Sequence, residues 1–264
     1  MSRAVIRDLG YQPYEGPRKV GSSAWVITWA GLRNSLRSRW TKWIGVAALI
    51  ATGGFGVAIY MALKVQTLTG GMGMPLPPEV TEKLFKADTF VGSAVLLCGS
   101  FLGFFVAVLV AGPALSDDLK GGGLHFHFTR PVGIADYVVG KILPAALSVT
   151  LLGLIPAVIL GLMRVSLSPE GEALSRPLMT LIKAIALAGA CGVSLSIPAV
   201  ALSSLTTRRG VARTLWALIY WIPPGVGAAL AKVTDKSSYY VISLTGALES
   251  LSAEFFGGDS PAKG

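Results

Sequence analysis

Long apolar runs, separated by short polar segments, dominate this chain. Five of the runs are about 20 residues long and contain no Asp, Glu, Lys or Arg, and an α-helix needs roughly that length to cross the hydrocarbon core of a bilayer. Because lipid offers no hydrogen bonds to the backbone, each run is predicted to be helical. The sequence therefore predicts an all-α, polytopic transmembrane helix bundle. The predicted spans are Trp43–Leu63, Phe90–Leu115, Ile142–Met163, Ala184–Leu205 and Leu215–Ala231.

The C-terminal end of the pattern departs from this regularity. Pro223 and Pro224 predict that the fifth span is a kinked or broken helix. After it, Tyr239–Phe256 is apolar but only marginally long enough to span, and it carries Glu249 and Glu254, which are costly in hydrocarbon. A sixth span is thus missing or marginal. We expect residues 232–264 to form an extracytoplasmic interfacial segment and tail, with the tyrosines of that segment at headgroup depth.

A different apolar pattern precedes the first span. Trp25, Trp29 and Trp40 recur at helical spacing with Leu32 and Leu36, while arginines occupy the other faces. This pattern predicts an amphipathic interfacial helix over residues 25–42, behind a tail of residues 1–24 and ahead of a membrane domain of residues 43–231. The alternative is a soluble helix packed on loops. The residues expected at the membrane interface are Trp25, Trp29, Arg33, Arg37 and Trp40.

Charge changes the picture by its placement more than by its sum. The 264-residue chain has a formal net charge of +9, but only 14% of its residues are charged and its mean hydropathy is +0.62. The basic residues cluster beside the apolar runs, which argues against a nucleic-acid partner. Lys and Arg are enriched before the first span, between the second and third, and between the fourth and fifth, so these segments and the N-terminus are predicted to be cytoplasmic.

The cytoplasmic segment 121–141, GGGLHFHFTRPVGIADYVVGK, is the most distinctive polar stretch. His125 and His127 have neither a third histidine nor a nearby cysteine, so no metal site is predicted. Cys98 and Cys191 lie within apolar runs and lack metal-ligand spacing. The glycine triplet lacks the Lys-Ser/Thr of a phosphate-binding loop. A cytoplasmic segment too polar to span and too short for a domain is instead predicted to bind another protein.

In this region the chain resembles the membrane permeases of ABC exporters of the second type. The matching positions, which extend from the end of the second span into the third, are Asp117, Asp118, Gly122, Leu124, Phe128, Arg130, Pro131, Tyr137, Gly140 and Lys141. The chain departs from the family pattern in having aspartates where glutamates are usual and in lacking a clear sixth span.

The resemblance implies a permease subunit without catalytic, cofactor-binding or metal-binding residues of its own. ATP and magnesium would bind a separate ABC ATPase, and the chain would act as a homodimer or with a similar permease in a bacterial inner membrane. A membrane scaffold that couples ATP hydrolysis to envelope assembly is the alternative; an ion-driven secondary transporter and an intramembrane enzyme fit less well. The implied ATPase-docking loop comprises Asp117, Asp118, Gly122, Leu124, Phe126, Phe128, Arg130 and Pro131.

Small residues at intervals of four predict close helix contacts. Gly99 and Gly103 share a face of the second span, and Ala188, Gly192 and Ser196 share a face of the fourth. Such faces allow helix backbones to approach closely in lipid. We expect them to contribute to dimerisation, with packing inside one chain as the alternative.

Overall fold

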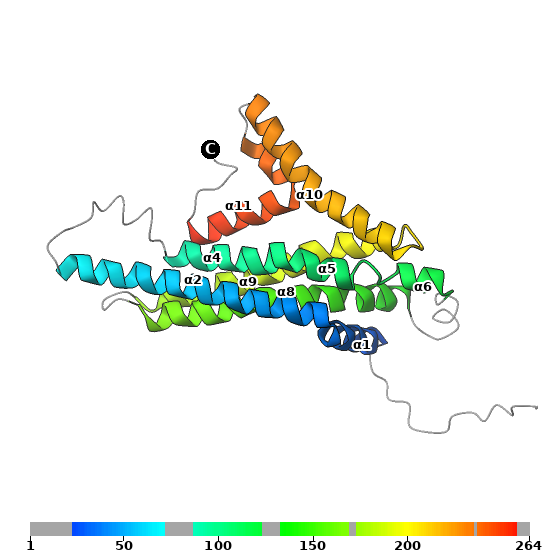
Figure 1. The fold of residues 1–264 in the computed structure, drawn as a ribbon, viewed down its shortest axis with the longest axis horizontal. Helices are drawn as coiled ribbons and strands as arrows, with labels where there is room; N and C mark the ends of the chain where they lie inside the picture. Colours follow the sequence, from blue (N-terminus) through cyan, green and yellow to red (C-terminus); the bar gives the residue numbers. More distant parts are fainter. Residues whose placement is uncertain (1–22, 72–86, 123–132, 169–172, 235–236, 258–264) are drawn as a thin grey trace, which may run out of the picture.

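The structure is a computed structural model that describes residues 23–71, 87–122, 133–168, 173–234 and 237–257. The described part is built from helices, in accordance with the all-α prediction (Figure 1). In chain order they are α1 Ser23–Arg37, α2 Arg39–Gly71, α4 Ala87–Leu96, the π-helix η1 Leu97–Leu102, α5 Gly103–Val110, α6 Ser116–Lys120, α8 Ile134–Ser166, α9 Ser175–Ser203, α10 Arg209–Thr234, the 3₁₀-helix η2 Ser237–Ile242 and α11 Leu244–Phe256.

The five predicted spans are confirmed as helical segments. Within the described residues, five segments are long and apolar enough to cross a membrane: Arg39–Met61, Ala87–Val110, Ile134–Ser166, Ser175–Ser203 and Arg209–Thr234. The second comprises α4, η1 and α5 and ends before the predicted Leu115, because residues 111–115 form turns. Of the two alternatives for the fifth span, a broken helix is wrong, since Pro223 and Pro224 both lie inside the continuous helix α10, whereas a kink stays a prediction.

The centre of the bundle is the contact between α8 and α9, and it relies on small residues. A Cβ atom added to Gly192 would lie 1.9 Å from Thr150 Oγ1, and one added to Gly153 would lie 3.1 Å from Ala188 Cβ. Gly99 of η1 approaches the same place, 3.3 Å from Cys191 Cβ by the same measure. The small-residue faces predicted to contribute to dimerisation are therefore used for packing within one chain. Small side chains allow the helix backbones to approach closely there, which favours helix association in lipid.

A second core region joins α5 to α10 through aromatic rings. Phe104 stacks on Tyr220 with ring centroids 4.3 Å apart, and Trp216 is 1% exposed beside them. The π-helical turn η1 precedes this cluster, and its Ser100 Oγ lies 3.2 Å from the Tyr220 hydroxyl. A π-turn shifts the helical register locally, and here it presents a hydroxyl to the tyrosine of the neighbouring span.

The amphipathic helix α1 lies across the bundle rather than along it. Figure 1 shows α1 nearly end-on where the long helices α2 and α8 run across the view. It ends at Arg37, and α2 begins at Arg39 after a single intervening residue. The predicted interfacial helix of residues 25–42 is therefore divided, and Trp40 belongs to the first turn of the first span.

The C-terminal segment returns to the bundle after α10. A Cβ atom at Gly227, about two turns before the end of α10, would lie 2.8 Å from the carbonyl oxygen of Tyr239, so η2 runs back along α10. Helix α11 then lies beside α4 (Figure 1), with Phe256 against Gly92, while Lys183 of α9 donates a 2.7 Å hydrogen bond to the Phe255 carbonyl. The depth of this segment in a bilayer remains a prediction.

Candidate functional site

The candidate site lies at the end of the bundle where α1, α6 and the first turns of α8 and α10 meet (Figure 1). The chain reaches it through turns after α5, where the backbone N–H of Leu115 donates to Ser203 Oγ at 3.2 Å. Ser116 Oγ donates to the Gly112 carbonyl at 3.2 Å. The short helix α6 ends at Lys120 with Gly121 as its C-cap, and Gly122 follows with φ of 65°, a left-handed conformation that glycine adopts without strain.

One carboxylate of α6 is held by two side chains of α8. Asp118 Oδ2 accepts a 2.5 Å hydrogen bond from the Tyr137 hydroxyl and lies 2.6 Å from Lys141 Nζ. The Lys141 ammonium also lies 5.6 Å from the centre of the Tyr137 ring. Tyr137 and Lys141 are four residues apart and so share one face of α8. The three side chains, which we call the Asp118 cluster, tie the two ends of the polar loop together.

The neighbouring carboxylate connects α6 to a different span. Asp117 Oδ1 accepts a short hydrogen bond from Arg209 Nε at the start of α10, and the two side chains form an ion pair. Asp117 is half-buried, whereas the Arg209 side chain is mostly exposed. Consecutive aspartates on this five-residue helix thus bind two separate spans, α8 and α10. A displacement of α6 would therefore act directly on both.

A cleft of about 920 Å³ opens beside these ion pairs, between α1, α6 and the adjoining ends of α2, α5, α8 and α10. Its wall includes apolar side chains such as Ile27 and Leu109, together with Lys141 and Arg213. The Nε atom of Arg213 and the Oγ1 atom of Thr41 are buried at this cleft without a hydrogen-bond partner among the described residues. A buried donor that lacks a partner is costly, so the cleft is chemically suited to receive an acceptor group.

The structure brings together only part of the predicted docking loop. Asp117, Asp118 and Gly122 lie at the site, whereas Leu124, Phe126, Phe128, Arg130 and Pro131 fall outside the described residues, as do both histidines. The sequence did not predict which basic residues form ion pairs with the two aspartates. It contains basic residues near the ends of several spans, but sequence position alone does not show which of them contact Asp117 and Asp118.

A third ion pair of the described residues lies at the opposite end of the bundle and was not predicted. The buried Arg164 near the end of α8 places Nε 3.1 Å from Asp88 Oδ1 at the start of α4, and Thr180 of α9 donates to the same oxygen at 3.1 Å. This contact joins three spans where α8 leaves the bundle core. In the sequence, Asp88 and Arg164 stood only as flanking charges.

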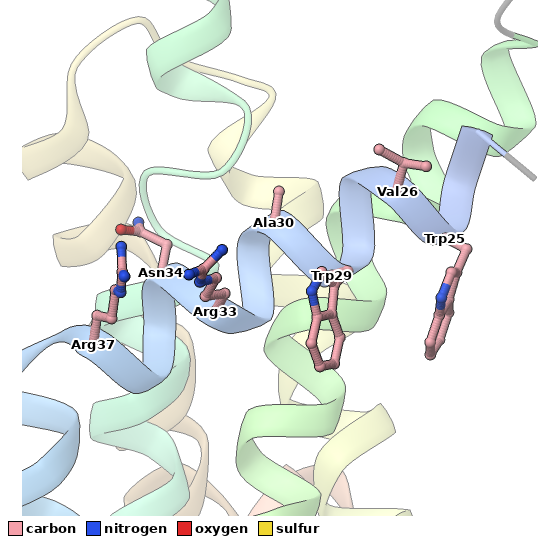
Figure 2. A pocket seen from close by; sticks show the side chains of 7 residues that line it. All are labelled: Trp25, Val26, Trp29, Ala30, Arg33, Asn34 and Arg37. Carbon is pink, nitrogen blue, oxygen red and sulfur yellow. The ribbon is translucent and has the colours of Figure 1, made fainter. Parts of the chain in front are cut away.

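The predicted interfacial residues of α1 lie on an exposed helix surface. Trp25 and Trp29 are 58% and 57% exposed, and Trp40 in α2 is 60% exposed. Figure 2 shows the Trp25 and Trp29 rings directed to the same side of α1. Exposed tryptophans are typical of a membrane–water boundary, since their rings are apolar and their N–H groups are polar.

Comparison with known protein families identifies the family of this chain. The sequence from residue 25 to residue 249 matches the family described as ABC-2 family transporter protein, a match that begins within α1 and ends within α11. The chain belongs to this family and is a multi-pass membrane component of an ABC transporter. No curated protein matches the chain.

Proposed function

We propose that the chain is the permease subunit of an ATP-driven exporter whose ATP is hydrolysed by a separate ABC ATPase. The observation that carries the proposal is the double attachment of α6, through Asp118 to α8 and through Asp117 to α10. Helix α6 leads directly into the loop that the family resemblance assigns to ATPase docking. ATP and magnesium would bind the partner, and the spans of this chain would change their arrangement in response.

In the proposed mechanism, ATP binding draws two ATPase subunits together and moves the docking loops. The Asp118 cluster transmits that movement to α8, and the Asp117–Arg209 pair transmits it to α10. The spans then shift between inward-facing and outward-facing arrangements, whose populations the nucleotide controls. The N-terminus and this end of the bundle face the cytoplasm in this proposal, which the distribution of Lys and Arg supports.

A second permease copy is expected to cover α2 and α10. Each span contains an apolar stretch of 18 residues, and only 17% of this stretch is buried in α2 and 22% in α10. The corresponding share is 44–50% in the other three spans. The two helices therefore keep large faces available for lipid or for a partner. Cross-linking of single cysteines along α2 and α10 is expected to join two chains, and cross-linking along α9 is not.

Docking is tested by co-expressing the chain with a candidate ABC ATPase subunit. Arg130→Glu combined with Phe128→Ala is expected to abolish co-purification of the ATPase and stimulation of its activity by the permease, because a charged and an apolar anchor are lost together. The matched control is Arg208→Glu with Leu205→Ala, which makes the same change of charge in the loop between α9 and α10, where Leu205 is 73% exposed. Equal loss in both variants, or none in either, contradicts the assignment.

A further inference from the structure

A hollow of about 750 Å³ runs along the exposed flank of α1 and shares part of its wall, including Asn34 and Arg37, with the cleft beside the ion pairs. One end is basic and polar, and the rest is apolar. In Figure 2 the side chains of Arg33, Asn34 and Arg37 lie together toward the end of the helix, whereas the two indole rings lie toward its start. The lining residues are Trp25, Val26, Trp29, Ala30, Arg33, Asn34 and Arg37.

The two arginines of this hollow lack an anionic partner within the described residues. Each of the ion pairs that the described part forms involves another basic residue, namely Lys141, Arg164 or Arg209. Arg33 and Arg37 are four residues apart, and like charges at that spacing on a helix repel one another. Two neighbouring guanidinium groups present parallel N–H donors that suit a phosphate group. An anion bound between the two groups would therefore relieve their mutual repulsion.

The position of α1 relative to α8 restricts where that anion comes from. A Cβ atom at Gly31 would lie 2.7 Å from Pro144 Cγ, and one at Gly140 would lie 2.9 Å from Ile27 Cβ. Ser148 Oγ and Ser35 Oγ are 2.9 Å apart. Helix α1 thus crosses the first half of α8. An amphipathic helix beside the end of a span is expected to lie among lipid headgroups, with its apolar side chains directed toward the acyl chains.

We propose that this hollow binds one anionic phospholipid of the leaflet that contacts α1. The guanidinium groups of Arg33 and Arg37 hold the headgroup phosphate, and the Asn34 side-chain amide donates to a headgroup oxygen. The acyl chains lie against Trp25 and Trp29. The site adds a lipid ligand to the transporter. The residues changed to test it differ from those changed to test ATPase docking, so failure of one proposal is distinguishable from failure of the other.

Lipid retention tests the proposal on the purified full-length chain. The protein in neutral detergent is mixed with phosphatidylglycerol or phosphatidylcholine, and bound lipid is counted by native mass spectrometry. One phosphatidylglycerol per chain is expected, with weaker retention of phosphatidylcholine. Arg33→Gln with Arg37→Gln is expected to reduce the affinity about tenfold or more, because two charge-assisted contacts are lost. Trp25→Ala with Trp29→Ala is expected to reduce it without any change of charge.

The matched control is Arg39→Gln with Lys42→Gln, which removes the same charge from exposed positions in the first turn of α2. This variant is expected to retain the lipid. Equal losses in the two charge variants would show general surface electrostatics and overturn the site. Displacement of the lipid by millimolar inorganic phosphate, with no effect of the tryptophan changes, would assign the arginines to free phosphate instead. Circular dichroism checks that each variant keeps its helical content.

Discussion

The hydroxyl of Tyr137 donates a 2.5 Å hydrogen bond to Asp118, a residue that lies 19 positions earlier, on the other side of the polar loop. The contact closes the loop at its base, and Lys141 neutralises the carboxylate from the next turn of α8. A loop that is anchored at both ends can pass a force to the spans, whereas a loop attached only through its backbone would absorb much of that force.

The first prediction concerns this anchor. Lys141→Met is expected to lower permease-stimulated ATP hydrolysis, because it removes the cation from Asp118. It should also lower the free energy of unfolding by about 1–3 kcal/mol, since a half-buried carboxylate loses a charged partner. Combining Asp118→Lys with Lys141→Asp should recover part of the activity that either change alone removes. The measurement is ATPase activity in reconstituted vesicles.

The control for the anchor is Lys120→Met, which removes the same charge from an exposed position at the end of α6. It should leave coupling and stability nearly unchanged. If Lys120→Met and Lys141→Met behave alike, the Asp118 cluster does not transmit the movement.

A second prediction uses two glycines of α9. Gly192→Ala should destabilise the bundle by about 1–3 kcal/mol, because the new methyl group would overlap Thr150 Oγ1 and force α8 and α9 apart. Gly189→Ala is the matched control, since no atom lies within 4 Å of its added Cβ. It should be neutral or slightly stabilising, as alanine favours the helix. Denaturant titration in mixed micelles compares the two, and equal effects would refute the packing argument.

The third prediction concerns the ion pair at the opposite end. Asp88→Asn removes a negative charge that faces the buried Arg164, and it is expected to cost about 1–3 kcal/mol because a buried cation loses one charged hydrogen-bond acceptor. Asp136→Asn is the control. Its carboxylate accepts an exposed hydrogen bond from Ser23, so its loss should cost about 0.5 kcal/mol or less. Thermal unfolding in detergent gives both values; a small effect at Asp88 would show that the pair adds little.

The fourth prediction concerns the location of the C-terminus. Helix α11 has 13 residues and is about 20 Å long, too short to cross a hydrocarbon core of about 30 Å. A cysteine at Ser260 should therefore react with a membrane-impermeant thiol reagent in intact cells. Cys98 and Cys191 are buried and supply an internal control for background labelling. Labelling only after permeabilisation would place the C-terminus in the cytoplasm.

The sequence by itself was sufficient for the fold class and for the helices that span. Uncharged runs of span length leave few alternatives in lipid, because the backbone must satisfy its own hydrogen bonds. The tryptophan and arginine spacing before Trp43 likewise predicted a helix, since that signal depends only on local periodicity. The aspartates of the loop were identified through resemblance to a family pattern, and the structure places them at the base of that loop.

The tertiary structure decided what each surface contacts. Gly99 and Gly192 each belong to a face of small residues that could form a dimer contact. Only the packed bundle shows that Cys191 and Thr150 of the same chain occupy those faces. Asp118 could have paired with any cation nearby, and the placement of α6 near the first turns of α8 selected Lys141. Pro223 remained inside a continuous helix. Pairings of this kind depend on the relative placement of helices far apart in the chain, and local sequence periodicity carries no information about that placement.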